Sequence, residues 1–140
     1  MSREDLRNEA RDSEGDPWVK ARLRQLRAQR ARKRMLAAVP TATVVVTNPI
    51  HYAIALSYDR DNNAAPRVVA KGMDTMAARI REAARAHGVP LVANPMLARA
   101  LYAIELDADI PAEHFQAVAE IIAYVWKLNA QVGVRRSAAT

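Results

Sequence analysis

The chain has 140 residues, a length that fits one ordinary domain and leaves no room for two full-sized ones. Alanine supplies much of the 51% apolar fraction, so the core is expected to be small and helix-rich, and aromatic residues, at 5%, are too few for the base-stacking platforms of single-stranded nucleic-acid binders. The net charge of +6 favours anionic partners, whereas the absence of cysteine excludes a disulfide framework, a thiol nucleophile and cysteine-type zinc sites. No apolar run reaches the roughly 18 residues of a membrane span, and Met1 is followed by polar residues, so we expect the chain as given to be soluble and unsecreted.

The positive charge is concentrated in one segment near the N-terminus. Residues 1–16 carry three arginines against six acidic residues, which makes this start acidic. The segment Lys20–Arg34 contains eight basic residues and no acidic one, and the remainder of the chain is nearly neutral. The basic character therefore belongs to one arm rather than to the whole molecule.

This arm is predicted to be a long helix. Asp16 can cap free backbone amides, and Pro17 follows at the first helical position, where its missing N–H does no harm. The helix is expected to run to about Leu36, and its basic residues interrupt the apolar stripe, so it should project from the body. We predict an acidic start and basic linker helix at 1–36, followed by a globular domain at 37–140.

Four short segments favour β-strands, because they are rich in β-branched or apolar residues and are bounded by turn signals. The predicted strands are Thr43–Thr47, Tyr52–Tyr58, Arg67–Lys71 and Leu91–Ala93. Gly72 is expected to stop the third strand. The first three strands follow one another closely enough to be mixed or antiparallel, and the helix before the fourth implies a parallel crossover.

Three helices are predicted among and after these strands. The first runs from about Met73 to His87, the second opens at Asn94-Pro95, and the third opens at Pro111. In the third, apolar residues recur at helical spacing and are expected to cover one sheet face, namely Phe115, Val118, Ala119, Ile122 and Trp126. The predicted fold class is therefore α/β, with a small mixed four-stranded sheet packed with helices and preceded by the long projecting basic helix.

The common catalytic and cofactor-binding patterns are missing from the sequence. His51, His87 and His114 share no metal-ligand spacing, and the four glycines form neither a Walker loop nor a dinucleotide-binding motif. The serines lack the local context of a hydrolase nucleophile. We predict no metal and no cofactor.

The segment Thr47-Asn48-Pro49-Ile50-His51 lies between two predicted strands and has a distinct chemistry. Proline has no N–H, so the usual attack of the next backbone nitrogen on the asparagine side chain is closed. The side-chain nitrogen of Asn48 can instead attack its own main-chain carbonyl, form a five-membered imide and expel the nitrogen of Pro49. His51 is the local residue that can act as a base or as a donor to the developing oxyanion.

The same residues also fit an ordinary turn in which His51 only hydrogen-bonds the loop. Asn94-Pro95 shows that an Asn-Pro step need not be reactive, because there it fits a capped helix start with proline at the first helical position. The residues alone leave both interpretations of Asn48-Pro49 open.

Taken together, the motifs resemble those of the cytoplasmic domain of the flagellar and type III secretion export-switch proteins, the FlhB/YscU family, and specifically its flagellar branch. The resemblance spans nearly the whole chain and is carried by Glu14-Gly15-Asp16-Pro17, the Arg-rich helix ending at Met35, Val44 to Ala53, Ala65 to Gly72, Leu97 to Tyr102 and Val118-Ala119-Glu120.

The resemblance implies that the chain cuts its own backbone between Asn48 and Pro49, as a single-turnover intramolecular reaction rather than as a turnover enzyme. The family motif is Asn-Pro-Thr-His, and this chain departs from it at Ile50. The nucleophile, the scissile bond and His51 remain, whereas a hydroxyl that could bond the turn is lost, so slowed cleavage is expected. The resemblance also implies that Ala65 and Pro66 contribute to a surface that accepts export substrates.

The resemblance further implies a switch component of the flagellar protein-export gate. Its implied partners are other gate subunits, a hook-length control protein, and export substrates or their chaperones. An N-terminal membrane domain, missing here, would hold the intact protein at the cytoplasmic face of the bacterial inner membrane. The basic helix would then lie near anionic lipids, although a solvated helix fits the same residues. The alternative function is a basic nucleic-acid-binding or regulatory adaptor without chemistry, but no groove-fitting motif or stacking residues support nucleic-acid binding.

Overall fold

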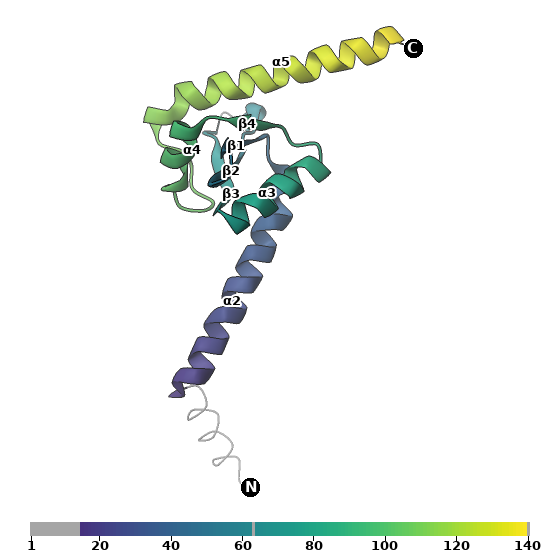
Figure 1. Cartoon of the computed structure of the whole chain (residues 1–140). Coiled ribbons are helices and arrows are strands. Elements are labelled where there is room, and N and C mark those ends of the chain that lie inside the picture. The colour runs from purple at the N-terminus through teal and green to yellow at the C-terminus, as the bar shows by residue number, and fades with distance from the viewer. Residues whose placement is uncertain (1–14, 63, 140) are drawn as a thin grey trace. The chain divides into compact units, whose positions relative to one another are not determined.

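The computed structural model describes residues 15–62 and 64–139 (Figure 1). The chain separates into two compact units, with the boundary between Arg34 and Met35. Most of the predicted acidic start falls outside the described residues. The predicted boundary after residue 36 stays a prediction.

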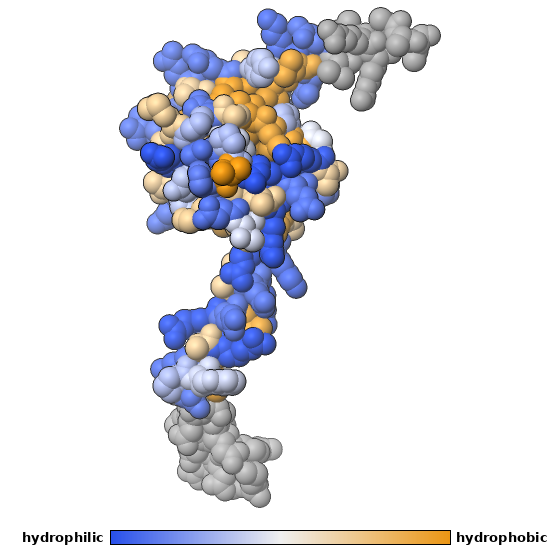
Figure 2. All heavy atoms as spheres, viewed as in Figure 1, coloured by the Kyte–Doolittle hydropathy of each residue, from blue (hydrophilic) through white to orange (hydrophobic). Residues whose placement is uncertain are grey.

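Helix α2 (Pro17–Ala38) begins where the sequence predicted. The side chain of Asp16 accepts a hydrogen bond of 2.8 Å from the backbone N–H of Trp18, as an N-terminal capping residue does. No side chain of α2 is buried, and Figure 2 shows a mostly hydrophilic surface along this helix. Its dense arginines explain both observations, because they leave no apolar stripe wide enough to pack. Among the described residues, no helix combines the length and apolar character that crossing a membrane requires.

The sheet has four strands in the order β3-β2-β1-β4, which are β1 (Val44–Asn48), β2 (Tyr52–Ser57), β3 (Arg67–Met73) and β4 (Leu91–Ala93). β1 pairs antiparallel with β2, β2 pairs antiparallel with β3, and β4 joins β1 in parallel. The predicted mixed four-stranded sheet is confirmed. β1 is central and its valines are fully buried, as expected for a β-branched run covered on both faces.

Helices cover both faces of the sheet, because alternate residues of each strand point to opposite sides. Val45 of β1 packs with α3 (Thr75–Ala86) in one cluster, together with η1 (Val39–Thr41). Val44 and Val46 pack with α4 (Pro95–Tyr102) and α5 (Phe115–Ala139) in the other. Figure 1 shows α3 on one side of the sheet and α4 and α5 on the other. Two further short 3-10 helices are η2 (Arg60–Asn62) and η3 (Ala112–His114).

The prediction that Gly72 stops the third strand is wrong. Gly72 pairs with Ala53 of β2, and β3 continues to Met73. A Cβ atom on Gly72 would lie 2.4 Å from the Cγ atom of Met76. The glycine is therefore needed for the close approach of α3 to β3 and not for ending the strand.

The predicted apolar stripe of the last helix is partly wrong. Val118 and Ile122 are buried, but Phe115 is 43% exposed, Ala119 is exposed and Trp126 is half-buried. The side chains that α5 buries are Val118, Ile121, Ile122 and Val125. The buried face of α5 is thus rotated about the helix axis relative to the predicted one. The apolar residues at the edge of this face remain partly exposed and can line a pocket.

Candidate functional site

The Asn48–His51 segment is a tight turn joining two central strands. Asn48 is the last residue of β1 and pairs with Tyr52, the first residue of β2. The backbone N–H of His51 donates a 2.8 Å hydrogen bond to the carbonyl oxygen of Asn48, which closes a four-residue turn through Pro49 and Ile50. The sequence predictions of a turn and of its flanking strands are confirmed, although Asn48 itself belongs to the strand rather than to a loop.

The acceptor in this turn is the carbonyl that the predicted reaction would attack. Its oxygen belongs to the Asn48–Pro49 peptide, and negative charge would develop on it when a nucleophile adds to the carbon. A backbone N–H at 2.8 Å is a well-placed donor for such an oxyanion. In the described part of the chain, no hydrogen bond holds the side chain of Asn48, so its amide can rotate toward its own carbonyl.

The strand that carries Asn48 is held on both sides. β2 pairs with all five residues of β1, and β4 pairs with three of them. The backbone N–H of Asn94 adds a hydrogen bond of 2.9 Å to the carbonyl of Thr47. Asn48 therefore stands at the end of a firmly held strand, whereas Pro49, Ile50 and His51, which follow it, are exposed to solvent.

Asn94-Pro95 has the same residue pair in a different setting. The Asn94 side-chain oxygen accepts a hydrogen bond of 3.2 Å from the backbone N–H of Leu97, which makes Asn94 the capping residue of α4. Its carbonyl accepts from the N–H of Ala98 at 2.9 Å, within the helix. The predicted capped helix start is confirmed, and the amide side chain is occupied there.

Asp74 lies beside His51, a neighbour that the sequence predictions missed. The Oδ1 atom of Asp74 is 3.5 Å from the Nδ1 atom of His51, and the backbone N–H of Asp74 donates a 3.0 Å hydrogen bond to the carbonyl of His51. The two residues are distant in sequence, and the predicted helix that starts at about Met73 includes Asp74, so no local signal connects them.

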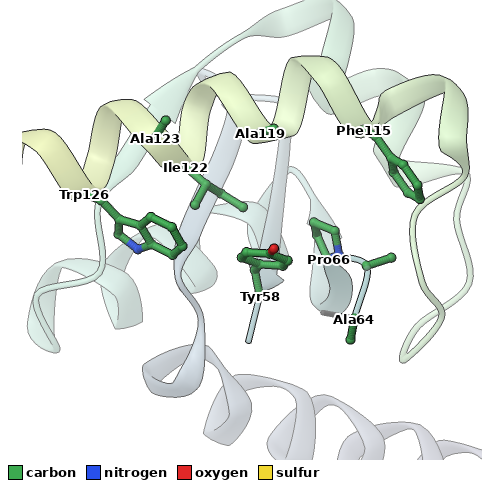
Figure 3. A pocket seen from close by; sticks show the side chains of 9 residues that line it. Tyr58, Ala64, Pro66, Phe115, Ala119, Ile122, Ala123 and Trp126 are labelled. Atoms are coloured by element: carbon green, nitrogen blue, oxygen red, sulfur yellow. The ribbon is translucent and has the colours of Figure 1, made fainter. Parts of the chain in front are cut away.

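A pocket of about 600 Å³ lies at the other end of β2. Its walls are Tyr58, Ala64, Ala65 and Pro66 from the β2–β3 connection, and Phe115, Ala119, Ile122, Ala123 and Trp126 from α5. In Figure 3, the side chains of Phe115, Ile122 and Trp126 reach from α5 toward Tyr58 and Pro66. The predicted substrate-binding residues Ala65 and Pro66 therefore lie in an apolar pocket, but they are not brought together with Asn48 and His51.

Aromatic contacts hold one wall of this pocket in place. The rings of Tyr58 and Trp126 lie 6.0 Å apart, and the guanidinium of Arg60 lies 5.3 Å from the centre of the Trp126 ring. Pro66 is fixed from the backbone, since its carbonyl accepts a hydrogen bond of 2.9 Å from the N–H of Ile110. The pocket is thus largely preformed.

Residues 15–62 and 64–139 contain no cluster of three or more His, Asp or Glu side chains arranged to hold a metal ion. The chemistry available at the turn is that of an amide, a carbonyl, an imidazole and a carboxylate. These groups suit proton transfer and acyl chemistry.

The model of the FlhB HrpN YscU SpaS family matches residues 1–125. The chain belongs to this family. It is 51% identical over 130 residues to the flagellar biosynthetic protein FlhB of Escherichia coli K12, an alignment that covers 92% of this chain and 34% of the relative. The FlhB of Bacillus subtilis is 47% identical over 133 residues, with 94% and 37% covered. The chain thus spans about a third of the length of these relatives, and its predicted family is confirmed.

Solved structures agree with the family. The cytoplasmic domain of FlhB from Shewanella putrefaciens matches with a TM-score of 0.70 at 47% identity, covering 74% of this chain and 81% of that one. The C-terminal domain of EscU, solved with an asparagine mutated to alanine, matches with a TM-score of 0.62 at 30% identity, covering 65% and 92%. The predicted fold class is therefore confirmed from two branches of the family.

Proposed function

We propose that the Asn48–Pro49 turn is a self-cleavage site, and that the domain serves as a substrate-specificity switch in a flagellar type III protein-export gate. The observation that carries the cleavage proposal is the hydrogen bond of 2.8 Å from the backbone N–H of His51 to the carbonyl oxygen of Asn48. It places a donor on the oxygen that must bear negative charge in the reaction.

The reaction uses atoms of the turn alone. The Nδ2 nitrogen of Asn48 attacks the carbonyl carbon of the same residue and closes a five-membered ring. When the oxygen re-forms the carbonyl, the bond from that carbon to the Pro49 nitrogen breaks. The proton lost from Nδ2 ends on the proline nitrogen, so the products are a fragment 1–48 with a C-terminal imide and a fragment 49–140 with a free N-terminal proline.

Positioning supplies much of the rate in such a reaction, because an amide nitrogen is a poor nucleophile. Holding reacting groups in attack geometry contributes about 7–11 kcal/mol in favourable intramolecular cases. β1 is paired with β4 as far as Thr47 and with β2 as far as Asn48, and the turn hydrogen bond fixes the Asn48 carbonyl. His51 then acts as the base that relays the proton from Nδ2 to the leaving nitrogen.

The pocket between α5 and the β2–β3 connection is proposed to accept an apolar segment of an export substrate. Ala65 is half-buried and Pro66 is buried. Their side chains are small, and they do not fill the space that the aromatic residues of α5 enclose on the opposite side. A preformed apolar pocket with few polar groups suits an apolar side chain of a peptide. Cleavage at the turn and binding at the pocket would then occur at opposite ends of β2.

The intact protein is proposed to act at the cytoplasmic face of the bacterial inner membrane with other export-gate subunits. The relatives named flagellar biosynthetic protein are about three times as long as this chain, which leaves room for further domains. The eight basic residues of Lys20–Arg34 suit an anionic lipid surface, where each contributes about 1 kcal/mol.

The deciding experiment is a time course of the purified chain on denaturing gels with intact-mass measurement. Self-cleavage predicts fragments 1–48 and 49–140, with a combined mass equal to that of the uncut chain before the imide hydrolyses. Asn48→Ala is the control and should give neither fragment. A chain that stays whole at all times would instead favour the alternative, a basic adaptor without chemistry, which a nucleic-acid binding assay would then examine.

A further inference from the structure

Asp74 has a backbone conformation that aspartate rarely adopts. Its φ is 49° and its ψ is −110°, close to the first central position of a type II′ turn, which glycine usually occupies. A side chain in this conformation costs free energy, so it persists only where the surrounding structure imposes it. Such outliers are concentrated at functional sites.

Helix capping does not account for the aspartate. Asp74 occupies the N-cap position of α3, where a carboxylate normally accepts a hydrogen bond from a backbone amide of the first turn. Here the side chain makes no such bond. Its Oδ1 atom lies 3.5 Å from the Nδ1 atom of His51 instead.

Three backbone features bring the β3–α3 junction to the turn. Met73 pairs with Tyr52 at the end of the β2–β3 ladder, and the N–H of Asp74 donates a 3.0 Å hydrogen bond to the carbonyl of His51. Gly72 permits the close packing of Met76, and with it the sharp change from strand to helix. The carboxylate therefore reaches His51 from a supported position rather than from a free loop.

We propose that Asp74 is a positioning residue for His51 in the cleavage of the Asn48–Pro49 bond, an inference that rests on the proposed self-cleavage. A carboxylate beside Nδ1 accepts a hydrogen bond from the N–H at that position and so keeps the proton on Nδ1 and the lone pair on Nε2. Nε2 then takes the proton from the Asn48 Nδ2 atom and returns it to the nitrogen of Pro49 as that nitrogen leaves. The distance of 3.5 Å is that of the resting state, and contacts of this kind shorten as the reaction proceeds.

The test is the cleavage rate of Asp74→Gly, which removes the carboxylate while relieving the backbone. We expect cleavage to slow by about tenfold, a part of the roughly 10²–10⁴-fold that a general base supplies. The matched control is Asp107→Gly, because Asp107 also has a positive φ, of 66°, but its N–H bonds to Val68 at the other end of β3. This control should cleave at the original rate, and an equal rate in Asp74→Gly would overturn the role of Asp74.

A double-mutant cycle separates positioning from a structural effect. If Asp74 acts through His51, the double variant Asp74→Gly, His51→Ala should cleave as slowly as His51→Ala alone. A full tenfold further loss in the double variant would overturn the proposal. A starting chain that yields no fragments would overturn the proposed self-cleavage itself, and this role with it, whereas unchanged cleavage in Asp74→Gly would remove only this inference.

A spectroscopic measurement reports the same contact without cleavage. In the Asn48→Ala chain, the nitrogen chemical shifts of the His51 ring should show the proton of the neutral ring on Nδ1. Asp74→Gly should move that proton toward Nε2. Identical ring spectra in the two chains would overturn the assignment of Asp74 to His51.

Discussion

Asn48 and Tyr52 are paired residues at the end of the β1–β2 ladder, and the turn between them contains the Asn48–Pro49 bond, the proposed site of cleavage. A cut after Asn48 would therefore leave every strand pair of the sheet intact. Val46 and Ile54, on the two sides of the cut, also share one buried cluster. We expect fragments 1–48 and 49–140 to remain together under native conditions and to separate in denaturant. Native size-exclusion chromatography checks this, and two separately eluting fragments would contradict it.

Asn48→Ala should abolish cleavage and leave the fold intact. The side chain supplies the attacking nitrogen, but it is only half-buried and makes no hydrogen bond in the described residues, so its loss should change the unfolding free energy by about 1 kcal/mol or less. Gel analysis and a urea titration measure the two effects. Appearance of the 49–140 fragment from this variant would rule out the imide mechanism.

His51→Ala should slow cleavage without abolishing it. The substitution removes the imidazole, worth roughly 10²–10⁴-fold as a general base, but it keeps the backbone N–H that bonds the Asn48 carbonyl at 2.8 Å. The rate of appearance of the 49–140 fragment, compared with the unchanged chain at one pH, measures the loss. Complete inactivity would mean that the ring, and not the backbone donor, carries the reaction.

Local signals were sufficient to predict the turn, whereas its cleavage chemistry stays a prediction that the family resemblance favours. The β-branched run before Asn48, the missing N–H of Pro49 and the nearby His51 all lie within a few residues. The structure places the run in β1 and the residues from Asn48 to His51 in the turn that follows it. Asp74 could not be predicted in this way, because its contact with His51 depends on how α3 packs against β3. That packing depends in turn on Gly72, which by itself reads as the end of a strand.

The face that the last helix buries could not be predicted from the local sequence either. Ile121 and Ile122 are both apolar, so the spacing alone permits more than one stripe. The position of α5 over the sheet selects Val118, Ile121, Ile122 and Val125 for burial. The resemblance to the family indicated Ala65 and Pro66, but the aromatic wall opposite them became visible only in three dimensions.

Ala65→Asp should weaken binding at the pocket without lowering the melting temperature. Ala65 is half-buried at the pocket wall, where a carboxylate would face the apolar residues of α5 but could still reach solvent. With a purified flagellar hook protein as the probe, we expect an affinity loss of about tenfold or more, corresponding to about 1.4 kcal/mol. Ala78→Asp is the matched control, because Ala78 is exposed on α3. An equal loss of stability and binding in Ala65→Asp would indicate a packing role instead.

Finally, Ile50→Thr should accelerate cleavage. Ile50 is 67% exposed, so the isoleucine contributes little packing, and the change mainly introduces a hydroxyl two residues after Asn48. A neutral hydrogen bond that orders the turn is worth about 1 kcal/mol, and a well-placed donor to the developing oxyanion is worth about 2–4 kcal/mol.

These energies correspond to an increase of roughly fivefold to a thousandfold in rate. A small increase would mean that the threonine orders the turn, whereas a large one would mean that its hydroxyl reaches the Asn48 carbonyl alongside the N–H of His51. A paired time course of the 49–140 fragment from both chains, at one pH and temperature, measures the ratio. Ile50→Val is the control, because it retains the β-branch without a hydroxyl and should cleave like the isoleucine chain. Equal rates for the Ile50 chain and its threonine variant would show that this position affects neither the conformation of the turn nor the negative charge that develops on the Asn48 carbonyl oxygen.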